Sequence, residues 1–193
     1  MGSTVNENNS VEEEIKRRIP LGNKAFYADL DLLKCKLLTK HSKLRMYKTL
    51  LRPAVTYACE TWVLKENIKT KLKVFERKVL RRIYGPTKQK DGIWRIKTNE
   101  ELNRLTGNKN TINYIIAQRL VWFGHVHPMP DTSMVTNVYE WSPAQTRSLG
   151  RPKSRWEDDV KSDITRVEIT NWKECIRNRT EWKKLVEKAL QLL

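Results

Sequence analysis

The sequence predicts a mainly α-helical protein, with a helical bundle, then a linker, then a small helical C-terminal subdomain. Apolar residues recur every three or four positions through most of the 193 residues. Glycine and proline interrupt this period at only a few places, and the segments between them have the length of ordinary helices. Hydrophobic residues make up 39% of the chain and include seven tryptophans, which is enough to build a core.

The N-terminal segment is polar before it becomes helical. Residues 1–18 are expected to form an acidic, partly disordered leader, because the first ten residues show no apolar period. Helical spacing then extends to residue 38, and Pro20 with Gly22 is expected to separate a short first helix from a longer second one. A basic helical domain is therefore placed at residues 19–97.

Two strongly basic helices are predicted within that domain. Ser42 is expected to cap the first helix, and Pro53 is expected to kink it. The second helix runs from about Asn67 to Tyr84 and ends at Gly85. Its apolar stripe consists of Ile68, Leu72, Phe75, Val79 and Ile83. Both helices are expected to bury an apolar face and present basic side chains elsewhere.

The C-terminal half is predicted from caps and composition. A loop or short strand around Trp94 precedes a helical extension at residues 98–124, which opens with a capping box and continues in a second helix after Thr111. Residues 125–150 lack periodicity and are expected to be a flexible linker. Residues 151–193 form a Trp-rich helical subdomain. The expected capping pairs are Thr98 with Glu101, Ser154 with Glu157, and Asn178 with Glu181.

Positive charge is concentrated in one third of the chain. The formal net charge is +16, and residues 34–97 carry 19 Lys and Arg against 4 Asp and Glu. Such a density favours an anionic partner, and the phosphate backbone of nucleic acid is the commonest one. A solvated surface is the alternative, but such surfaces usually mix both signs, and no acid lies between Lys34 and Cys59.

Compartment and cofactor signals are sparse. The chain has no apolar run of membrane-spanning length and its N-terminus does not resemble a signal peptide, so an intracellular location, nuclear or cytoplasmic, without membrane association is expected. Three cysteines far apart in sequence are expected to be reduced core thiols. His125 and His127 could offer two metal ligands, but ordinary packing or a phosphate contact is the preferred interpretation. No metal, cofactor or small-molecule substrate is expected.

Two acidic patterns were considered for catalysis. Residues 27–30 resemble a Tyr-x-Asp-Asp metal-binding turn, but Leu30 stands where the second carboxylate is needed. Asp159 and Asp163 share a helix face, together with Asp158 nearby, and could belong to a nuclease. Acids in a first helical turn more simply complement the helix dipole, so neither pattern predicts an enzyme.

A series of motifs occurs in a fixed order along most of the chain. They are Gly22–Tyr27, Lys43–Pro53 with the sequence KLRMYKTLLRP, Thr56–Trp62, Phe75–Pro86, Trp94–Leu102, Arg119–Val126, Gly150–Asp158, Trp172 and Trp182. In this order they resemble the C-terminal, post-palm part of reverse transcriptases encoded by non-LTR (LINE-type) retrotransposons, particularly RTE-like elements and genes derived from them. The second motif is similar to the family signature KLRLYKTLIRP.

The resemblance implies a place in a polymerase. Residues from about 19 to 85 would correspond to the thumb, a helical element that holds the RNA–DNA hybrid behind the palm. The palm and the endonuclease of the full element would be absent, so no activity is expected of the chain on its own. After Val126 the family usually has Glu-Arg-Met where this chain has His127-Pro128-Met129, so a basic position is lost there.

Charge and resemblance together predict a nucleic-acid-binding fragment of a retrotransposon RNA-directed DNA polymerase. It would hold the phosphate backbone of an RNA–DNA hybrid, RNA or DNA without catalysis. The expected contacts are Lys43, Arg45, Lys48, Arg52, Lys69, Lys73, Arg77, Lys78, Arg81 and Arg82, with Arg151, Lys153 and Arg155 as a second group. The alternatives are a metal-dependent nuclease, or a domesticated scaffold whose Trp-rich helices dock on a protein such as a separate polymerase subunit. Packing of Trp156, Trp172 and Trp182 inside the protein would favour a core role for those residues over docking.

Overall fold

The computed structural model describes residues 2–3, 11–107, 109–141 and 156–192. These residues are mainly helical, which confirms the predicted fold class. They divide into two compact units. The basic unit comprises residues 1–59 and 64–112, and the aromatic unit comprises residues 60–63 and 113–193. Each unit has its own core and is described separately below.

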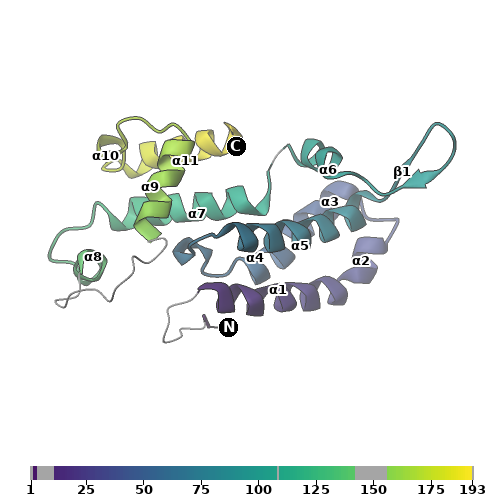
Figure 1. Cartoon of the computed structure of the whole chain (residues 1–193), viewed down its shortest axis with the longest axis horizontal. Helices are drawn as coiled ribbons and strands as arrows, with labels where there is room; N and C mark the ends of the chain where they lie inside the picture. Colours follow the sequence, from purple (N-terminus) through teal and green to yellow (C-terminus); the bar gives the residue numbers. More distant parts are fainter. Residues whose placement is uncertain (1, 4–10, 108, 142–155, 193) are drawn as a thin grey trace. The chain divides into compact units, whose positions relative to one another are not determined.

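The first helix of the basic unit, α1 (Val11–Ala28), continues through Pro20, so the expected break there is wrong. Proline inside a helix costs roughly 3 kcal/mol. Burial of Ile15 and Phe26 offsets this cost, since each contributes roughly 1.5–3 kcal/mol. Figure 1 shows α1 side by side with α4 and α5, against which it packs. The chain turns only at Asp29, before α2 (Leu30–Lys34), and the expected end of the leader at residue 18 lies inside α1.

The next helical stretch is irregular where a proline was expected to distort it. Helix α3 (Lys40–Met46) runs into the π-helical turn η1 (Tyr47–Leu51) and then into α4 (Arg52–Val55). Pro53 has no N–H to donate to the carbonyl group four residues earlier, which lies in η1, and a π turn accommodates that loss. The N-cap is Thr39, whose hydroxyl accepts a hydrogen bond from the Ser42 N–H, so the expected cap at Ser42 is wrong.

Helix α5 (Glu66–Tyr84) is the central element of the basic unit and matches its prediction within one residue. The whole predicted apolar stripe is buried: Ile68, Leu72, Phe75, Val79 and Ile83. The helix ends at Gly85, whose φ of 70° lies in the region that glycine adopts most easily. Helices α1, α2, α3 and α6 all pack against α5. Its buried stripe therefore determines where the rest of its surface, including its basic side chains, is presented.

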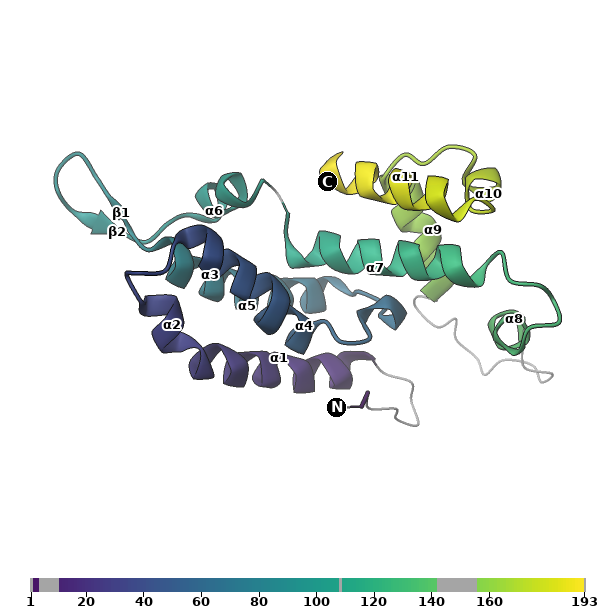
Figure 2. The same cartoon turned by 180° about the vertical axis from the view of Figure 1, so that it is seen from behind.

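A hairpin and a capped helix follow α5. Strands β1 (Thr87–Lys88) and β2 (Trp94–Arg95) pair antiparallel, as expected around Trp94. Both Figure 1 and Figure 2 show this hairpin projecting from the helices of the basic unit. Helix α6 (Asn99–Thr106) opens with the predicted capping box of Thr98 and Glu101, in which both reciprocal hydrogen bonds are present.

The aromatic unit holds the remaining helices. They are α7 (Thr111–Val126), α8 (Met134–Glu140), α9 (Trp156–Arg166), α10 (Trp172–Cys175) and α11 (Arg179–Leu192). The 3₁₀ turn η2 (Cys59–Thr61) overlaps the segment 60–63 of this unit. The region expected to be a linker therefore contains a helix, and its residues 142–150 lie outside the described part, as does the expected cap Ser154. Asn178 caps α11 as predicted, since its Oδ1 accepts hydrogen bonds from the backbone N–H groups of Thr180 and Glu181.

Aromatic rings form the core of this unit around Phe123. The centroid of the Phe123 ring lies 6.2 Å from that of Trp156, 5.5 Å from that of Trp172 and 6.4 Å from that of Trp182. The indole N–H of Trp182 donates to the Leu120 carbonyl oxygen at 2.8 Å, and Trp182 is 2% exposed. This packing favours the core interpretation of the tryptophans over docking on another protein.

Candidate nucleic-acid interface

Helix α5 carries the densest positive charge of the basic unit. Its residues include seven Lys and Arg against Glu66 and Glu76. Because the apolar stripe is buried against the neighbouring helices, the cations occupy the remaining surface of the helix. The predicted contacts on α5 and on the preceding α3, η1 and α4 differ in how far their side chains are available, and they fall into three groups.

The first group is available to a ligand. Arg45 on α3, Lys48 on η1 and Arg82 on α5 are exposed, and none of the three side chains pairs with another side chain in the described part of the chain. Lys73 and Arg77 on α5 are half-buried, so part of each side chain is accessible. These five cations are the best placed for phosphate contacts.

The second group is engaged within the protein. Lys78 Nζ donates to Asn23 Oδ1 at 2.9 Å and to the Tyr27 hydroxyl at 3.2 Å, and it lies 4.4 Å from the centroid of the Tyr27 ring. Arg81 donates through Nε to the Lys97 carbonyl oxygen at 3.3 Å and through Nη2 to Asn99 Oδ1 at 2.9 Å. Lys78 therefore holds α1 to α5, and Arg81 holds the hairpin exit to α5.

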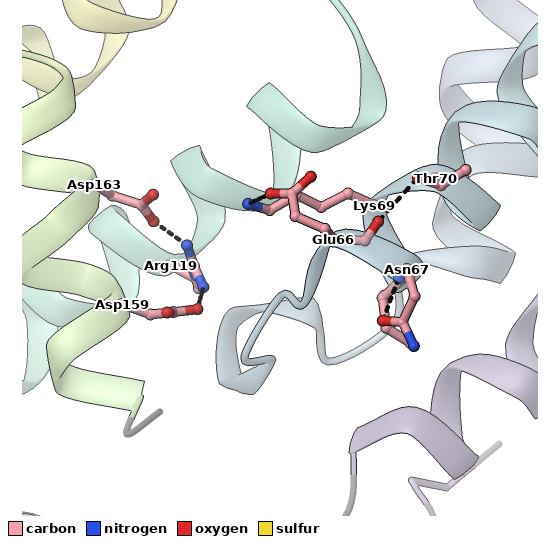
Figure 3. Close-up of polar contacts among 8 residues, drawn as sticks. Glu66, Asn67, Lys69, Thr70, Arg119, Asp159 and Asp163 are labelled. Carbon is pink, nitrogen blue, oxygen red and sulfur yellow. Dashed lines mark hydrogen bonds and ion pairs between the residues drawn. The ribbon is translucent and has the colours of Figure 1, made fainter. Parts of the chain in front are cut away.

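Lys69 is engaged more loosely than these two. Its Nζ lies 2.7 Å from Glu66 Oε1, in an ion pair at the first turn of α5 that Figure 3 shows. The Glu66 side chain is 82% exposed and that of Lys69 is 23% exposed, and a solvent-accessible pair of this kind contributes at most about 1 kcal/mol. A phosphate could displace Glu66 from Lys69 at little cost.

The third group is poorly placed. Lys43 is only 8% exposed, because α3 packs against α5, and Arg52 is half-buried beside the Tyr47 and Glu76 side chains. Burial therefore closes Lys43 to a polyanion, whereas the half-buried Arg52 side chain lies against a buried carboxylate. Arg151, Lys153 and Arg155 lie outside the described residues.

A groove brings several of these cations together with aromatic rings. It has a volume of about 570 Å³ and lies where α1, α2, the C-terminal end of α5 and the hairpin exit meet. Its lining consists of Phe26, Tyr27, Leu30, Lys78, Arg81, Arg82, Gly85, Pro86, Ile96 and Lys97. Of these described residues, four are cationic and none is acidic.

Sequence reasoning did not identify Tyr27 or Lys97 as part of a site. Tyr27 belongs to the Gly22–Tyr27 motif and to the polymerase-like turn, and Lys97 belongs to the Trp94–Leu102 motif, but neither pattern indicates a ligand contact. They meet because the hairpin returns the chain to the end of α5, with Lys97 Nζ donating to Thr87 Oγ1 at 2.6 Å. The sequence shows a tyrosine close to a basic segment, which is the signal that could have indicated a site. The exposure of its ring beside the cations depends on tertiary contacts.

Two of the acidic candidates pair with a buried arginine. Arg119, which is 2% exposed, donates to Asp159 Oδ2 at 2.9 Å and to Asp163 Oδ2 (Figure 3). It also donates to the Trp62 carbonyl oxygen at 3.0 Å. The two carboxylates thus neutralise a buried guanidinium within the aromatic unit. Residues 27–30 lie at the end of α1 and the start of α2, so they form no hairpin turn.

The histidines and cysteines show ordinary packing in the described part of the chain. The His127 ring stacks on Phe123 at 5.2 Å between centroids, and burial lowers its pKa. Cys59 is buried, while Cys35 and Cys175 are partly exposed, so the expectation of buried thiols holds for Cys59 alone. Within the described residues, no three His, Cys, Asp or Glu side chains gather as metal ligands, and no helix has the length and apolarity needed to cross a membrane.

Comparison with known proteins gives one relative. The chain is 25% identical over 190 residues to an uncharacterized transposon-derived protein of Caenorhabditis elegans, and the alignment covers 94% of this chain and 67% of the relative. No protein-family model matches the chain, and no solved structure matches it. The predicted link to transposable elements is confirmed at this level: the chain is similar to a transposon-derived protein over nearly its whole length.

Proposed function

We propose that this chain is the thumb and post-thumb part of a non-LTR reverse transcriptase, or of a gene derived from one, and that it binds an RNA–DNA hybrid through its phosphates without catalysis of its own. The similarity to a transposon-derived protein supports the origin. The observation that carries the binding is helix α5, which buries its apolar stripe together with Glu76 and carries seven cations against one exposed acid, Glu66.

Phosphate contacts explain why cations rather than recognition motifs dominate this surface. Lys and Arg that neutralise phosphates release condensed counterions, which drives binding without reading the bases. Exposed Arg45, Lys48 and Arg82, together with half-buried Lys73 and Arg77, are the proposed contacts. Sequence preference should therefore be weak, and affinity should depend steeply on salt.

The test is a salt series with a blunt RNA–DNA hybrid. The logarithm of the affinity should fall linearly with the logarithm of the salt concentration, with a slope of about −0.9 for each phosphate contact. Side-by-side measurements with duplex DNA, duplex RNA and single strands give the preference. A slope near zero would remove the electrostatic basis of the proposal.

A charge-matched pair of variants locates the contacts. Changing Arg45, Lys48 and Arg82 together to glutamine should weaken hybrid binding and flatten the salt slope by about 0.9 per lost contact. Changing Arg177, Lys183 and Lys184 to glutamine removes the same charge from exposed positions of the aromatic unit and should have little effect. Equal losses in both variants would mean that net charge alone drives binding.

Absence of catalysis is the second part of the proposal. Asp159 and Asp163 are paired with Arg119, which supports a structural role over a metal-dependent nuclease. The purified chain is expected neither to extend a primer nor to cleave nucleic acid with Mg²⁺ present. Metal-dependent cleavage that is lost in Asp159→Ala would contradict this part and leave the binding result untouched.

A further inference from the structure

The groove beside Tyr27 contains features that a phosphate backbone does not use. Tyr27 is 60% exposed, although its ring belongs to a helix whose neighbouring residue Phe26 is buried. Leu30 and Ile96 add apolar walls. Phosphates interact with cations and N–H groups, so the aromatic and apolar parts of this groove call for a ligand with a flat apolar surface as well as charge.

The Tyr27 ring is held in one orientation by its neighbours. Its centroid lies 5.3 Å from that of Phe26, with the two planes at 71°, and Lys78 Nζ lies over the ring at 4.4 Å. Lys78 also donates to the Tyr27 hydroxyl at 3.2 Å. A cation therefore lies over one face of the ring, while the residue as a whole stays 60% exposed at the groove. A positioned ring of this kind is a stacking platform for a nucleobase.

Cations line the groove around that platform. Arg82 is exposed, and its guanidinium forms no hydrogen bond in the described part of the chain. Lys97 is held in place through its bond to Thr87 Oγ1. Lys78 and Arg81 add positive charge although their donors are used within the protein. Since no described lining residue is acidic, the groove has an uncompensated positive potential that suits a phosphate.

The size of the groove distinguishes an unpaired nucleotide from a duplex. A volume of about 570 Å³ lies in the range of roughly 300–1,000 Å³ that holds one small molecule. A double helix presents its bases stacked and paired inside, where a side chain of the protein surface cannot stack on them. An unpaired nucleotide offers a free base face and a phosphate within one groove-sized unit.

We propose that this groove binds an unpaired nucleotide of a nucleic-acid strand, with the base stacked on Tyr27 and the phosphate held by Arg82 and Lys97. This inference rests on the proposed function, because it assumes that the chain binds an RNA–DNA hybrid. It adds that the chain also binds a single-stranded extension next to that hybrid. A free nucleotide has the same chemistry, so the experiment includes it.

The experiment compares a blunt RNA–DNA hybrid with the same hybrid carrying a short single-stranded extension, using the full chain. The extension should raise affinity about tenfold, the effect of one base stacked on an aromatic side chain. 2-Aminopurine placed in the extension should lose fluorescence on binding, because stacking quenches it. A mononucleotide is tested as competitor: if it suppresses only the extension-dependent gain, the site accepts the free nucleotide as well, which supports the same chemistry.

Two variants at one position isolate the stack. Tyr27→Ala should abolish the gain and the fluorescence loss, whereas Tyr27→Phe, which loses the same hydroxyl contact to Lys78 but keeps the ring, should retain both. Circular dichroism checks that both fold, as expected for a residue outside the core. Normal binding of the blunt hybrid with no gain from the extension would overturn this inference and leave the proposed function standing. Failure to bind the blunt hybrid would count against the proposed function itself.

Discussion

The two units each contain a buried polar hub, but the central residue of one hub is an acid and that of the other is a cation. In the basic unit, the Glu76 carboxylate accepts hydrogen bonds from the Tyr47 hydroxyl at 2.9 Å and from the Thr111 N–H at 3.0 Å. In the aromatic unit, the buried cation Arg119 donates to two aspartates. The unit with an excess of surface cations therefore buries an acid.

Because of this difference, the outward-facing cations of α5 and the buried ion pairs of Arg119 lie in different units. Burial of Glu76 removes an acid from the surface of α5, so the cations there face outward with little opposing charge. Arg119 does the reverse in the aromatic unit, where a cation is used to hold α7 to α9. The basic unit is therefore the place to test for polyanion binding, and the aromatic unit is the place to test for structural ion pairing.

The largest effect is expected from Arg119→Met. The substitution leaves Asp159 and Asp163 without their buried cation, and breaking a buried pair by removing one member costs roughly 3–5 kcal/mol. Urea unfolding followed by tryptophan fluorescence measures it, because all the tryptophans except Trp94 lie in the aromatic unit. A loss below 1 kcal/mol would show that the three-residue hub is dispensable, and the comparison between the units would fail.

A smaller effect is expected from Glu76→Gln in the basic unit. The amide can accept from one N–H or O–H through its oxygen, but it cannot replace a carboxylate that uses both oxygens toward Thr111. Hydrogen bonds to a charged group contribute roughly 1.5–3 kcal/mol. The same substitution also tests the Tyr47 hydroxyl. Burial and the charge of Glu76 raise the pKa of this hydroxyl well above its usual range.

The readout for Glu76→Gln is unfolding of the basic unit. It can be followed by hydrogen exchange of α5, or by the fluorescence of Trp94 in a chain whose other tryptophans are replaced by phenylalanine. Tyr47→Phe is the matched control, because it removes the hydrogen bonds of the hydroxyl to Glu76 and Thr111 and leaves those from the Thr111 N–H to the carboxylate. If Tyr47→Phe destabilises as much as Glu76→Gln, the hub depends on the hydroxyl and not on the carboxylate.

Close helix packing at glycine is common to both units and gives the next prediction. A methyl group at Gly22 would overlap Val55 Cγ2 and approach the Phe75 ring, and one at Gly124 would overlap the Trp182 indole. Gly22→Ala and Gly124→Ala should therefore each destabilise by about 1–3 kcal/mol, although alanine is normally the better helix former. Thermal unfolding of the two variants measures this, and an increase in melting temperature for either would show that its neighbours can move aside.

Local features were predicted well and tertiary ones were not. The stripe of α5 and the cap of α6 depend on residues three or four apart, so the sequence contains all that is needed. Helix α1 continues through Pro20 because distant residues of α4 and α5 bury its face. The pairing of Arg119 with Asp159 spans 40 residues, and no period or spacing indicates it.

The candidate site divides in the same way. Charge counting correctly located the cations on α5, but it could not tell exposed Arg82 from Lys78, which holds α1, or from Lys43, which is buried. The groove needs Tyr27 from α1 and Lys97 from the hairpin exit, which are distant in sequence. A helical period places a residue on a face, but it does not say which other helix lies opposite.

The smallest expected effect concerns the cap of α6. Hydrogen bonds from Arg95 and from the Thr98 backbone N–H lower the pKa of Glu101 from 4.5 to about 2. The folded state thus favours the charged carboxylate, so its stabilising contribution is complete above pH 4.5 and is lost as the pH falls from there toward 2. The wild-type chain should lose stability in this window.

Glu101→Gln tests the origin of that loss. The amide does not titrate, so the variant should be slightly less stable than the wild type at neutral pH, and the difference between the two should shrink as the pH falls below 4.5. Denaturant midpoints at a series of pH values measure this difference. A constant gap between wild type and variant down to pH 2.5 would mean that the carboxylate charge contributes nothing, and that the reciprocal hydrogen bonds of the cap act through geometry alone.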